Sequence, residues 1–258
     1  MPMQEIKVRS TLDGSVEPSL LAPGNPNAPS PLVVCLHTWS EDRFNQVQPM
    51  LELTRPRRWA LLLPEFRGPN LKCNPRRTEA CASRLAMQDV IDAVEHVRQQ
   101  HRIDMTKLFL LGGSGGGHMA LMLAAHFPRY WSAVSSWCPI THLATWHGQN
   151  PRYAPHIAAC CGDAPGRSPT VDRQYADRSP LSHVAGLAKA RLYLHHGRAD
   201  HSVPWSHSWR LAEALIRHRA SRFYFDLFDG GHELRHELAM RQFDMITDQA
   251  QPAEALTG

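Results

Sequence analysis

The chain has 258 residues, of which 43% are hydrophobic and 20% are charged. This apolar share excludes an intrinsically disordered protein, and the 16 Gly and 20 Pro, scattered without a period, exclude a collagen-like one. A chain of this length buries roughly 70–75% of its unfolded surface, so one large core needs no disulfide or metal to hold it together. The composition therefore favours a single α/β domain over residues 1–258.

The net charge is +4, from 28 Lys and Arg against 24 Asp and Glu. The basic residues form no stripe interleaved with aromatic residues, so we expect no nucleic-acid partner. No apolar run approaches the ~18 residues that a membrane span needs, so we expect no membrane span. The segment Met1–Ser10 lacks the pattern of a signal peptide, which makes the cytoplasm the default location. The sequence does not indicate an oligomeric state.

The six cysteines contain no CxxC pair, so a structural zinc site is not expected. Cys35 falls in an apolar run and is expected to be a buried thiol. Cys73 and Cys81 flank a polar loop and could form a disulfide, whereas Cys160 and Cys161 are adjacent. We expect neither a metal nor a cofactor.

Strands and helices alternate along the chain, after a hairpin that turns at Asp13-Gly14. The expected strands are Ile6–Val8, Val16–Leu21, Leu32–Leu36, Trp59–Leu63, Lys107–Leu111, Trp131–Ser136, Arg191–His195 and Arg222–Phe228. The expected helices are Phe44–Leu53, Ser83–Gln99, His118–Phe127, Trp205–His218 and one that begins near Glu233. Residues 140–180, rich in Pro, Gly and His, are expected to form an irregular cap or lid. The alternation predicts βαβ units, hence a parallel sheet with helices on both faces.

A run of glycines, Gly112–Gly117, surrounds Ser114. Taken alone, GGSGGG is typical of a flexible linker. The apolar segment KLFLL precedes it, however, and the apolar segment HMALMLAAHF follows it, and a linker would not join two core elements directly. We therefore interpret Gly112-x-Ser114-x-Gly116 as a nucleophile elbow, a sharp strand-to-helix turn that exposes a catalytic serine.

An orienting acid and a base are expected after the nucleophile, in the chain order Ser, acid, His. Asp200 follows a buried strand in a loop before a helix, and His232 lies in a glycine turn after the last expected strand. Asp200 could instead be a turn or capping residue, and Asp229 could replace it only by breaking the order. The histidines that compete for the role of base all precede the last strand, which the order disfavours: His195, His196 and His201.

Acyl transfer also needs N–H donors for the developing oxyanion. We expect the backbone N–H of Gly115 to be one, because it directly follows the nucleophile. The second is expected from the loop after Leu32–Leu36, with Trp39 as first choice and Thr38 as the alternative. Ligands bind at the carboxyl ends of the strands in such sheets, which makes three tryptophans candidates for the substrate pocket: Trp39, Trp137 and Trp146. Trp137 is equally consistent with a core position.

These motifs resemble those of the α/β-hydrolase superfamily, in particular the catalytic domains of prolyl oligopeptidase-like and dienelactone hydrolase-like enzymes. The resemblance extends from Leu32 to the helix after His232, and its marks are LVVCLHTW, GGSGGG, SPLSHV, HGRADHSVP and GGHE. It implies an α/β-hydrolase fold with a small cap, and it gives Ser114, Asp200 and His232 the roles of nucleophile, acid and base. The chain departs from many relatives in carrying His37-Thr38 where they have His-Gly, and from dienelactone hydrolases in lacking a cysteine nucleophile.

From these features we expect a serine hydrolase that cleaves carboxylic esters, either small or polymer-borne, through an acyl-enzyme. Prolyl oligopeptidases carry a large β-propeller, for which 258 residues leave no room. An open-sited esterase is therefore expected ahead of its alternative, a prolyl oligopeptidase-like peptidase acting on small peptides.

The segment His232–His236 also matches HExxH, the signature of zinc proteases. That chemistry requires one continuous helix through both histidines and a third ligand downstream. Gly230-Gly231 directly precedes His232 and predicts a turn instead, so a zinc hydrolase is a less favoured alternative. A non-catalytic binding protein on the same fold is another, and the intact set of serine, acid and histidine disfavours it.

Overall fold

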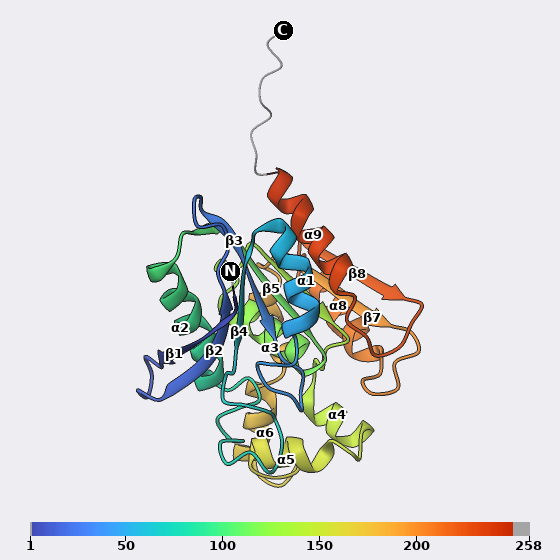
Figure 1. Ribbon diagram of the computed structural model, residues 1–258. Helices are drawn as coiled ribbons and strands as arrows, with labels where there is room; N and C mark the ends of the chain where they lie inside the picture. Colours follow the sequence, from blue (N-terminus) through green and yellow to red (C-terminus); the bar gives the residue numbers. More distant parts are fainter. Residues whose placement is uncertain (1, 250–258) are drawn as a thin grey trace.

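The computed structural model describes residues 2–249 and contains one eight-stranded sheet with helices on both faces (Figure 1). The strands are β1 Gln4–Arg9, β2 Val16–Ala22, β3 Ser30–Leu36, β4 Ala60–Pro64, β5 Ile103–Gly113, β6 Ala133–Trp137, β7 Leu192–Gly197 and β8 Phe223–Phe228. The helices are α1 Val47–Arg57, α2 Arg84–Gln100, α3 Gly115–His126, α4 Leu143–Gln149, α5 Ala154–Cys161, α6 Pro169–Asp177, the 3-10 turn η1 Pro180–His183, α7 Val184–Leu187, α8 Ser206–Arg217 and α9 His236–Gln249.

The strands lie in the order β1-β2-β4-β3-β5-β6-β7-β8. Strand β2 pairs antiparallel with β1 on one side and with β4 on the other. All pairings from β4 through β3, β5, β6 and β7 to β8 are parallel. The central strands are continuous apolar runs because helices cover both of their faces. This arrangement confirms the α/β-hydrolase fold, and most expected elements differ from the observed ones only at their ends.

Two apolar clusters fill the space between the sheet and its helices. One cluster joins the sheet to α2, α3, α7 and α8, and the other joins the opposite face to α1 and α9. Phe109 of β5 stacks on Phe243 of α9 with ring centroids 4.5 Å apart, which fixes the last helix against the centre of the sheet. The loops at the carboxyl ends of the parallel strands begin where these two apolar clusters end.

The segment 140–180 was expected to be irregular, and this expectation is wrong: the segment forms the short helices α4, α5 and α6. They lie together at one end of the sheet (Figure 1). A third apolar cluster holds them, and it includes Trp39 and Val203 from the loops of the main body. The apolar faces of these helices thus pack against one another and against these loops, and not against the sheet. The sequence of this segment therefore lacks the apolar periodicity of a helix that packs on a sheet.

A buried arginine ties the hairpin to α2. The side chain of Arg67 is inaccessible to solvent, and its guanidinium donates to Asp89 at 2.9 Å, to Asp13 at 2.7 Å and to Glu79 at 2.8 Å. Asp13 lies in the turn between β1 and β2, whereas Asp89 lies on α2. Arg67 therefore joins elements that lie far apart in the sequence.

All six cysteines are free thiols. Cys35 is buried, which confirms the expectation from its apolar run. The suggested bridge between Cys73 and Cys81 is wrong, since Cys73 is exposed whereas Cys81 lies inside the third cluster.

Among the described residues, the helices are all too short or too polar to cross a membrane.

Candidate active site

Ser114 sits on a strained turn between β5 and α3. Its backbone angles are φ 55° and ψ −120°, a conformation that L-residues rarely adopt. The turn needs small neighbours: a Cβ on Gly112 would lie 2.2 Å from the Gly116 carbonyl oxygen, and a Cβ on Gly116 would lie 2.6 Å from that of Leu36. The Ser114 N–H donates to the Trp137 carbonyl at 2.8 Å, which holds the turn against β6. The glycines of the elbow are therefore required by close backbone contacts.

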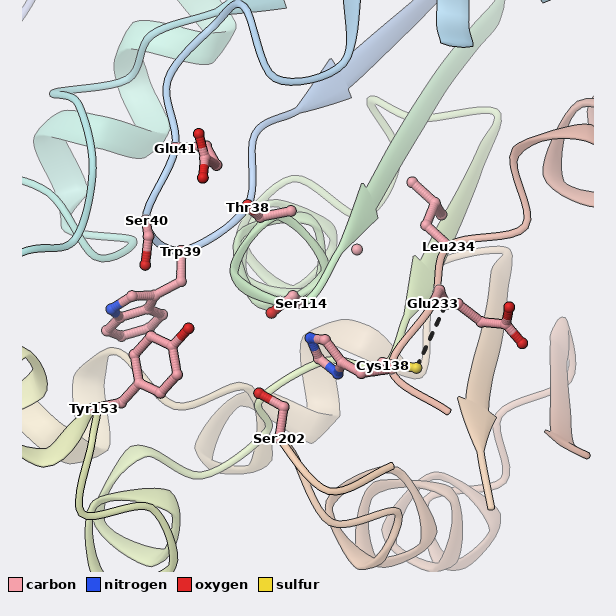
Figure 2. Close-up of a pocket in the computed structure, with 12 residues that line it drawn as sticks. Thr38, Trp39, Ser40, Glu41, Ser114, Cys138, Tyr153, Ser202, Glu233 and Leu234 are labelled. Atoms are coloured by element: carbon pink, nitrogen blue, oxygen red, sulfur yellow. Dashed lines mark hydrogen bonds between the residues drawn. The ribbon is translucent and has the colours of Figure 1, made fainter. Parts of the chain in front are cut away.

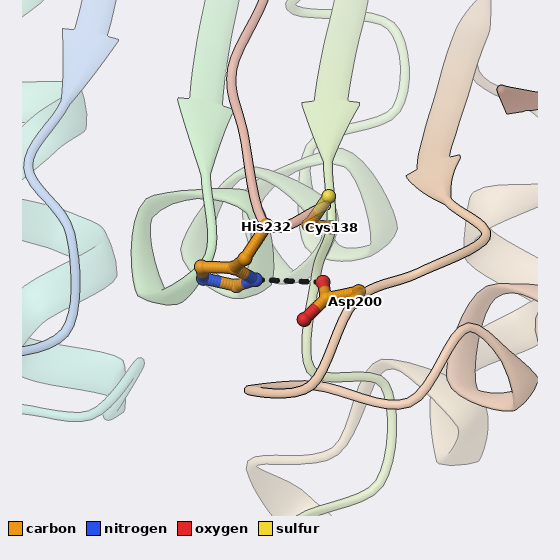
Figure 3. Close-up of side chains that lie close together, drawn as sticks. All are labelled: Cys138, Asp200 and His232. Carbon is orange, nitrogen blue, oxygen red and sulfur yellow. Dashed lines mark hydrogen bonds and ion pairs between the residues drawn. The ribbon is translucent and has the colours of Figure 1, made fainter. Parts of the chain in front are cut away.

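Asp200 and His232 come from the loops after β7 and β8 and meet in a hydrogen bond. The His232 Nδ1–H donates to Asp200 Oδ2 over 2.7 Å (Figure 3). The other carboxylate oxygen, Oδ1, accepts the backbone N–H groups of Ser202 at 2.8 Å and Val203 at 2.9 Å. These contacts fix the carboxylate, and they leave Nε2 of His232 as the nitrogen that carries no proton.

His196, expected from the sequence only as a competitor for the role of base, is a further partner of Asp200. Its buried ring lies with Nε2 3.2 Å from Asp200 Oδ2 and 2.9 Å from the Val203 carbonyl, while Ser208 donates to Nδ1. Burial alone would raise the pKa of Asp200. The hydrogen bonds from His196 and His232 outweigh that effect and hold the pKa well below its ordinary value. The carboxylate therefore stays ionised at neutral pH.

Ser114 and His232 line the same pocket, which has a volume of about 220 Å³. Figure 2 shows Ser114 among the side chains that line it. Its walls come from the elbow, from the loops after β3, β6, β7 and β8, and from the residue just before α5: Thr38, Trp39, Ser40, Glu41, Gly113, Ser114, Cys138, Tyr153, Ser202, His232, Glu233 and Leu234. Within residues 2–249, no direct hydrogen bond joins the Ser114 hydroxyl to the His232 ring. Such contacts often tighten only when substrate binds.

The loop after β3 brings a second backbone N–H beside the elbow. A Cβ on Gly115 would lie 2.5 Å from the Trp39 nitrogen, so the two main chains are in direct contact. The Thr38 N–H is occupied, because it donates to the Asn45 side chain at 3.2 Å. The Trp39 N–H makes no hydrogen bond within the described part of the chain. Of the two expected donors, Trp39 is thus the one that remains available.

The three candidate tryptophans have different places. Trp39 lines the pocket, and Trp146 packs behind it, with ring centroids 4.9 Å apart. Trp137 does not line the pocket: it is fully buried in the core and stacks on His195 at 3.9 Å. Its side chain belongs to the apolar cluster that joins the sheet to α1 and α9, and its carbonyl accepts the Ser114 N–H.

Tyr153 and Cys138 also line the pocket, although no motif in the sequence pointed to either residue. Tyr153, just before α5, stacks on Trp146 at 4.9 Å and lies beside Trp39 in Figure 2. Cys138 directly follows β6 and adopts φ 45°. Burial, together with the charge of Asp200, raises the pKa of its thiol to about 12. The short, Pro-rich segment around Tyr153 has no apolar periodicity that would predict a helix. Cys138 follows a strand whose sequence predicts only a buried core position.

The HExxH segment does not form a zinc-protease helix. His232 lies in the loop, whereas His236 is the first residue of α9. The Nε2 atom of His236 is hydrogen-bonded to Gln46 at 2.7 Å. The two histidines are therefore not one helical turn apart on a single helix, which that chemistry requires.

Comparison with known proteins relates the chain to serine hydrolases. The model of the prolyl oligopeptidase family matches residues 83–248, and that of the esterase PHB depolymerases matches residues 18–145. The acylamino-acid-releasing enzyme of Rattus norvegicus is 26% identical over 228 residues, which are 83% of this chain and 30% of the rat protein. Acylamino-acid-releasing enzyme 2 of Oryza sativa is 30% identical over 156 residues, or 57% of this chain and 20% of its own length.

Solved structures share the fold. A puromycin-hydrolysing peptidase of Mycobacterium tuberculosis superposes with a TM-score of 0.74 at 20% identity, over 94% of this chain and 38% of its own. An acylaminoacyl peptidase of Pyrococcus horikoshii gives 0.71 at 16% identity, over 96% and 41%. The chain thus spans less than half the length of these relatives. With a family model that covers most of its length and the architecture described above, the chain belongs to the prolyl oligopeptidase family of serine hydrolases.

Proposed function

We propose that this chain is a serine peptidase that cleaves amide bonds in short peptides through Ser114, His232 and Asp200. The observation that carries the proposal is the 2.7 Å hydrogen bond from His232 to Asp200, made by a histidine that shares its pocket with a serine on a strained elbow. The relatives named as peptidases favour this reading over the ester hydrolase that the sequence analysis placed first.

The chemistry follows from the tautomer of His232. Its Nδ1–H is held by Asp200, so Nε2 can take the proton of the Ser114 hydroxyl as the oxygen attacks the scissile carbonyl. The N–H groups of Gly115 and Trp39 would stabilise the oxyanion, a contribution of about 10²–10³ in kcat per donor. Protonated His232 then gives its proton to the leaving amine, and water releases the acyl-enzyme by the reverse sequence. Asp200 stays ionised throughout and stabilises the imidazolium.

The pocket supports a small acyl group. Its volume of about 220 Å³ lies below the ~300–1,000 Å³ typical of sites for drug-sized ligands. The rings of Trp39 and Tyr153 form one wall, which suits a single apolar or aromatic side chain next to the scissile bond. Short peptides with such a residue are therefore the preferred substrates.

An ester hydrolase remains the second candidate, because the PHB depolymerase model matches residues 18–145. Aminoacyl p-nitroanilides and p-nitrophenyl esters of graded chain length, assayed side by side, separate the two. We expect turnover of the anilides, best with an aromatic acyl residue. Turnover of the esters alone would establish the esterase and overturn the peptidase.

A variant of the nucleophile tests the site itself. Ser114→Ala should lower kcat by about 10⁴–10⁶ and abolish labelling by a fluorophosphonate. Ser182→Ala, which alters an exposed serine of η1 outside the pocket, is the matched control and should label like the wild type. Labelling that persists in Ser114→Ala would contradict the proposed nucleophile.

A further inference from the structure

Three side chains of the types that can bind a metal ion converge beside the pocket. The Cys138 sulfur, a carboxylate oxygen of Asp200 and a ring nitrogen of His232 all lie within 4.8 Å of one another (Figure 3). They come from the loops after three adjacent parallel strands, β6, β7 and β8, so the edge of the sheet sets their positions. The proposed peptidase mechanism uses the acid and the base but has no part for the thiol.

The spacing of the three atoms fits one small cation. Bonds of about 2.3 Å to sulfur and about 2.0–2.2 Å to nitrogen and oxygen place the ligands of a tetrahedral zinc ion roughly 3.4–3.6 Å apart. The observed separations, which reach at most 4.8 Å, therefore have to close by no more than about 1.2–1.4 Å. The Asp200–His232 pair, at 2.7 Å, would have to open by about 0.7 Å to admit the ion between its two atoms.

The cluster is open to solution on one side. Cys138 and His232 line the pocket that holds Ser114, and the His232 side chain is 29% exposed. A water molecule from the pocket can supply the fourth ligand. Two backbone carbonyls also lie near the sulfur, that of Glu233 at 3.6 Å and that of Gly231 at 3.7 Å.

From this geometry we propose that Cys138, Asp200 and His232 form an inhibitory binding site for a thiophilic divalent cation such as Zn²⁺. A thiolate, an imidazole and a carboxylate together favour Zn²⁺, Cd²⁺ or Co²⁺ over Mg²⁺ and Ca²⁺, which prefer oxygen ligands alone. The inhibitory effect rests on the proposed function, whereas the binding does not.

The bound ion would stop catalysis through the base. Cys138 releases its thiol proton to solvent as the sulfur–metal bond forms, and no group is oxidised. When Nδ1 of His232 binds the ion, its proton moves to Nε2, and that nitrogen can no longer accept the proton of Ser114. A chelator would therefore restore activity, the reverse of its effect on an enzyme that uses zinc for catalysis.

Binding is tested first without substrate. Co²⁺ is titrated into the apo protein, and thiolate-to-cobalt charge-transfer absorption in the near ultraviolet reports the Cys138 bond. We expect saturable absorption in the wild type and in Cys73→Ser, which removes an exposed cysteine as the matched control. Cys138→Ser, Cys138→Ala and His232→Ala should bind at least about tenfold more weakly, since even loss of a group behind the ligands costs about 10–100-fold. An unchanged titration in folded Cys138 variants overturns the site.

Inhibition is tested second, with each variant compared with its own zinc-free rate. Zn²⁺ should inhibit the wild type and Cys73→Ser, EDTA should reverse the effect, and Mg²⁺ should have none. Cys138→Ser should need at least about tenfold more Zn²⁺ for the same inhibition. Equal inhibition of this variant overturns the proposal. A protein without peptidase activity would refute the proposed function alone, because the cobalt titration still decides whether the site exists.

Discussion

Arg67 offers the sharpest test of how the fold is held together. Arg67→Met removes a guanidinium that is inaccessible to solvent and keeps most of the side-chain volume. Asp89 loses its ion-pair partner and, with a side chain that is 1% exposed, cannot turn to water, whereas Asp13 and Glu79 are 35% and 38% exposed and can. Glu17, which is 5% exposed, keeps its ion pair with Arg76 at 2.7 Å. The variant therefore leaves one buried carboxylate unpaired.

The expected cost follows from that single charge. Removing one partner of a buried ion pair destabilises a protein by about 3–5 kcal/mol. For a chain of this size each kcal/mol lowers Tm by about 2 °C, so we expect a drop of roughly 6–10 °C. Arg241→Met is the matched control, since its ion pair with Glu237 is 72% and 75% exposed at 3.5 Å. That change should cost less than about 1 kcal/mol.

Two further measurements identify the cause. Arg67→Met/Asp89→Leu removes both charges and should be more stable than Arg67→Met alone, because no buried charge remains unpaired. Burial raises the pKa of Asp89 even with Arg67 bound, so a folded Asp89 without its partner takes up a proton more readily than an unfolded one. A carboxyl group whose pKa is raised in the folded protein favours folding only while it is protonated, so its contribution is lost as pH rises. The loss of unfolding free energy in Arg67→Met should therefore be smaller at pH 5 than at pH 8.

Differential scanning calorimetry and urea unfolding at both pH values provide the assay. A Tm for Arg67→Met within 2 °C of that for Arg241→Met, or a double variant that is the least stable of the set, would refute this role of Arg67.

The site and the acid response give three more predictions. Asp200→Asn should lower kcat by about 10⁴, because an amide at this position no longer holds the Nδ1–H tautomer of His232; steady-state kinetics with a wild-type-like rate would contradict this. Gly116→Ala should abolish activity or folding, since its Cβ would lie 2.6 Å from the Leu36 carbonyl, whereas Gly148→Ala, with open space around it, should change the circular dichroism melt by less than about 3 °C. The pKa of Asp13 is lowered, chiefly by its hydrogen bond from Arg67. Burial acts to raise the pKa of Glu79, but the hydrogen bonds from Arg67 and Arg76 outweigh it and lower that pKa as well. The contribution of both carboxylates to stability should therefore be lost as pH falls below about 4. Urea midpoints that stay constant from pH 6 to pH 3 would exclude that contribution.

The parts of the fold that could be predicted are those that depend on the local chain. Apolar runs such as LVVCL become strands covered on both faces, and Gly112 and Gly116 mark a turn that no side chain can enter. The positions of Asp200 and His232 followed from the order of strands, because the carboxyl ends of parallel strands lie at one edge of the sheet. The structure brings these two residues into contact.

The parts that could not be predicted depend on contacts between distant segments. The helices α4–α6 bury their apolar faces against one another and against Trp39 and Val203, and several prolines interrupt their pattern. Tyr153 enters the pocket through this packing. An arginine is seldom fully buried, and the approach of Asp13, Glu79 and Asp89 from three other segments makes the burial of Arg67 favourable.

The end of β6, a strand whose sequence is typical of a buried core, contacts the segments that carry the proposed catalytic residues. β6 lies between β5, which ends at the elbow, and β7, which leads to Asp200. The Trp137 carbonyl accepts the Ser114 N–H, and the next residue, Cys138, donates its own N–H to the His195 carbonyl of β7 at 2.8 Å. The Cys138 sulfur reaches the backbone that flanks His232. Two consecutive residues thus contact the segments that carry the proposed nucleophile, acid and base, although the Trp137 side chain never touches the pocket.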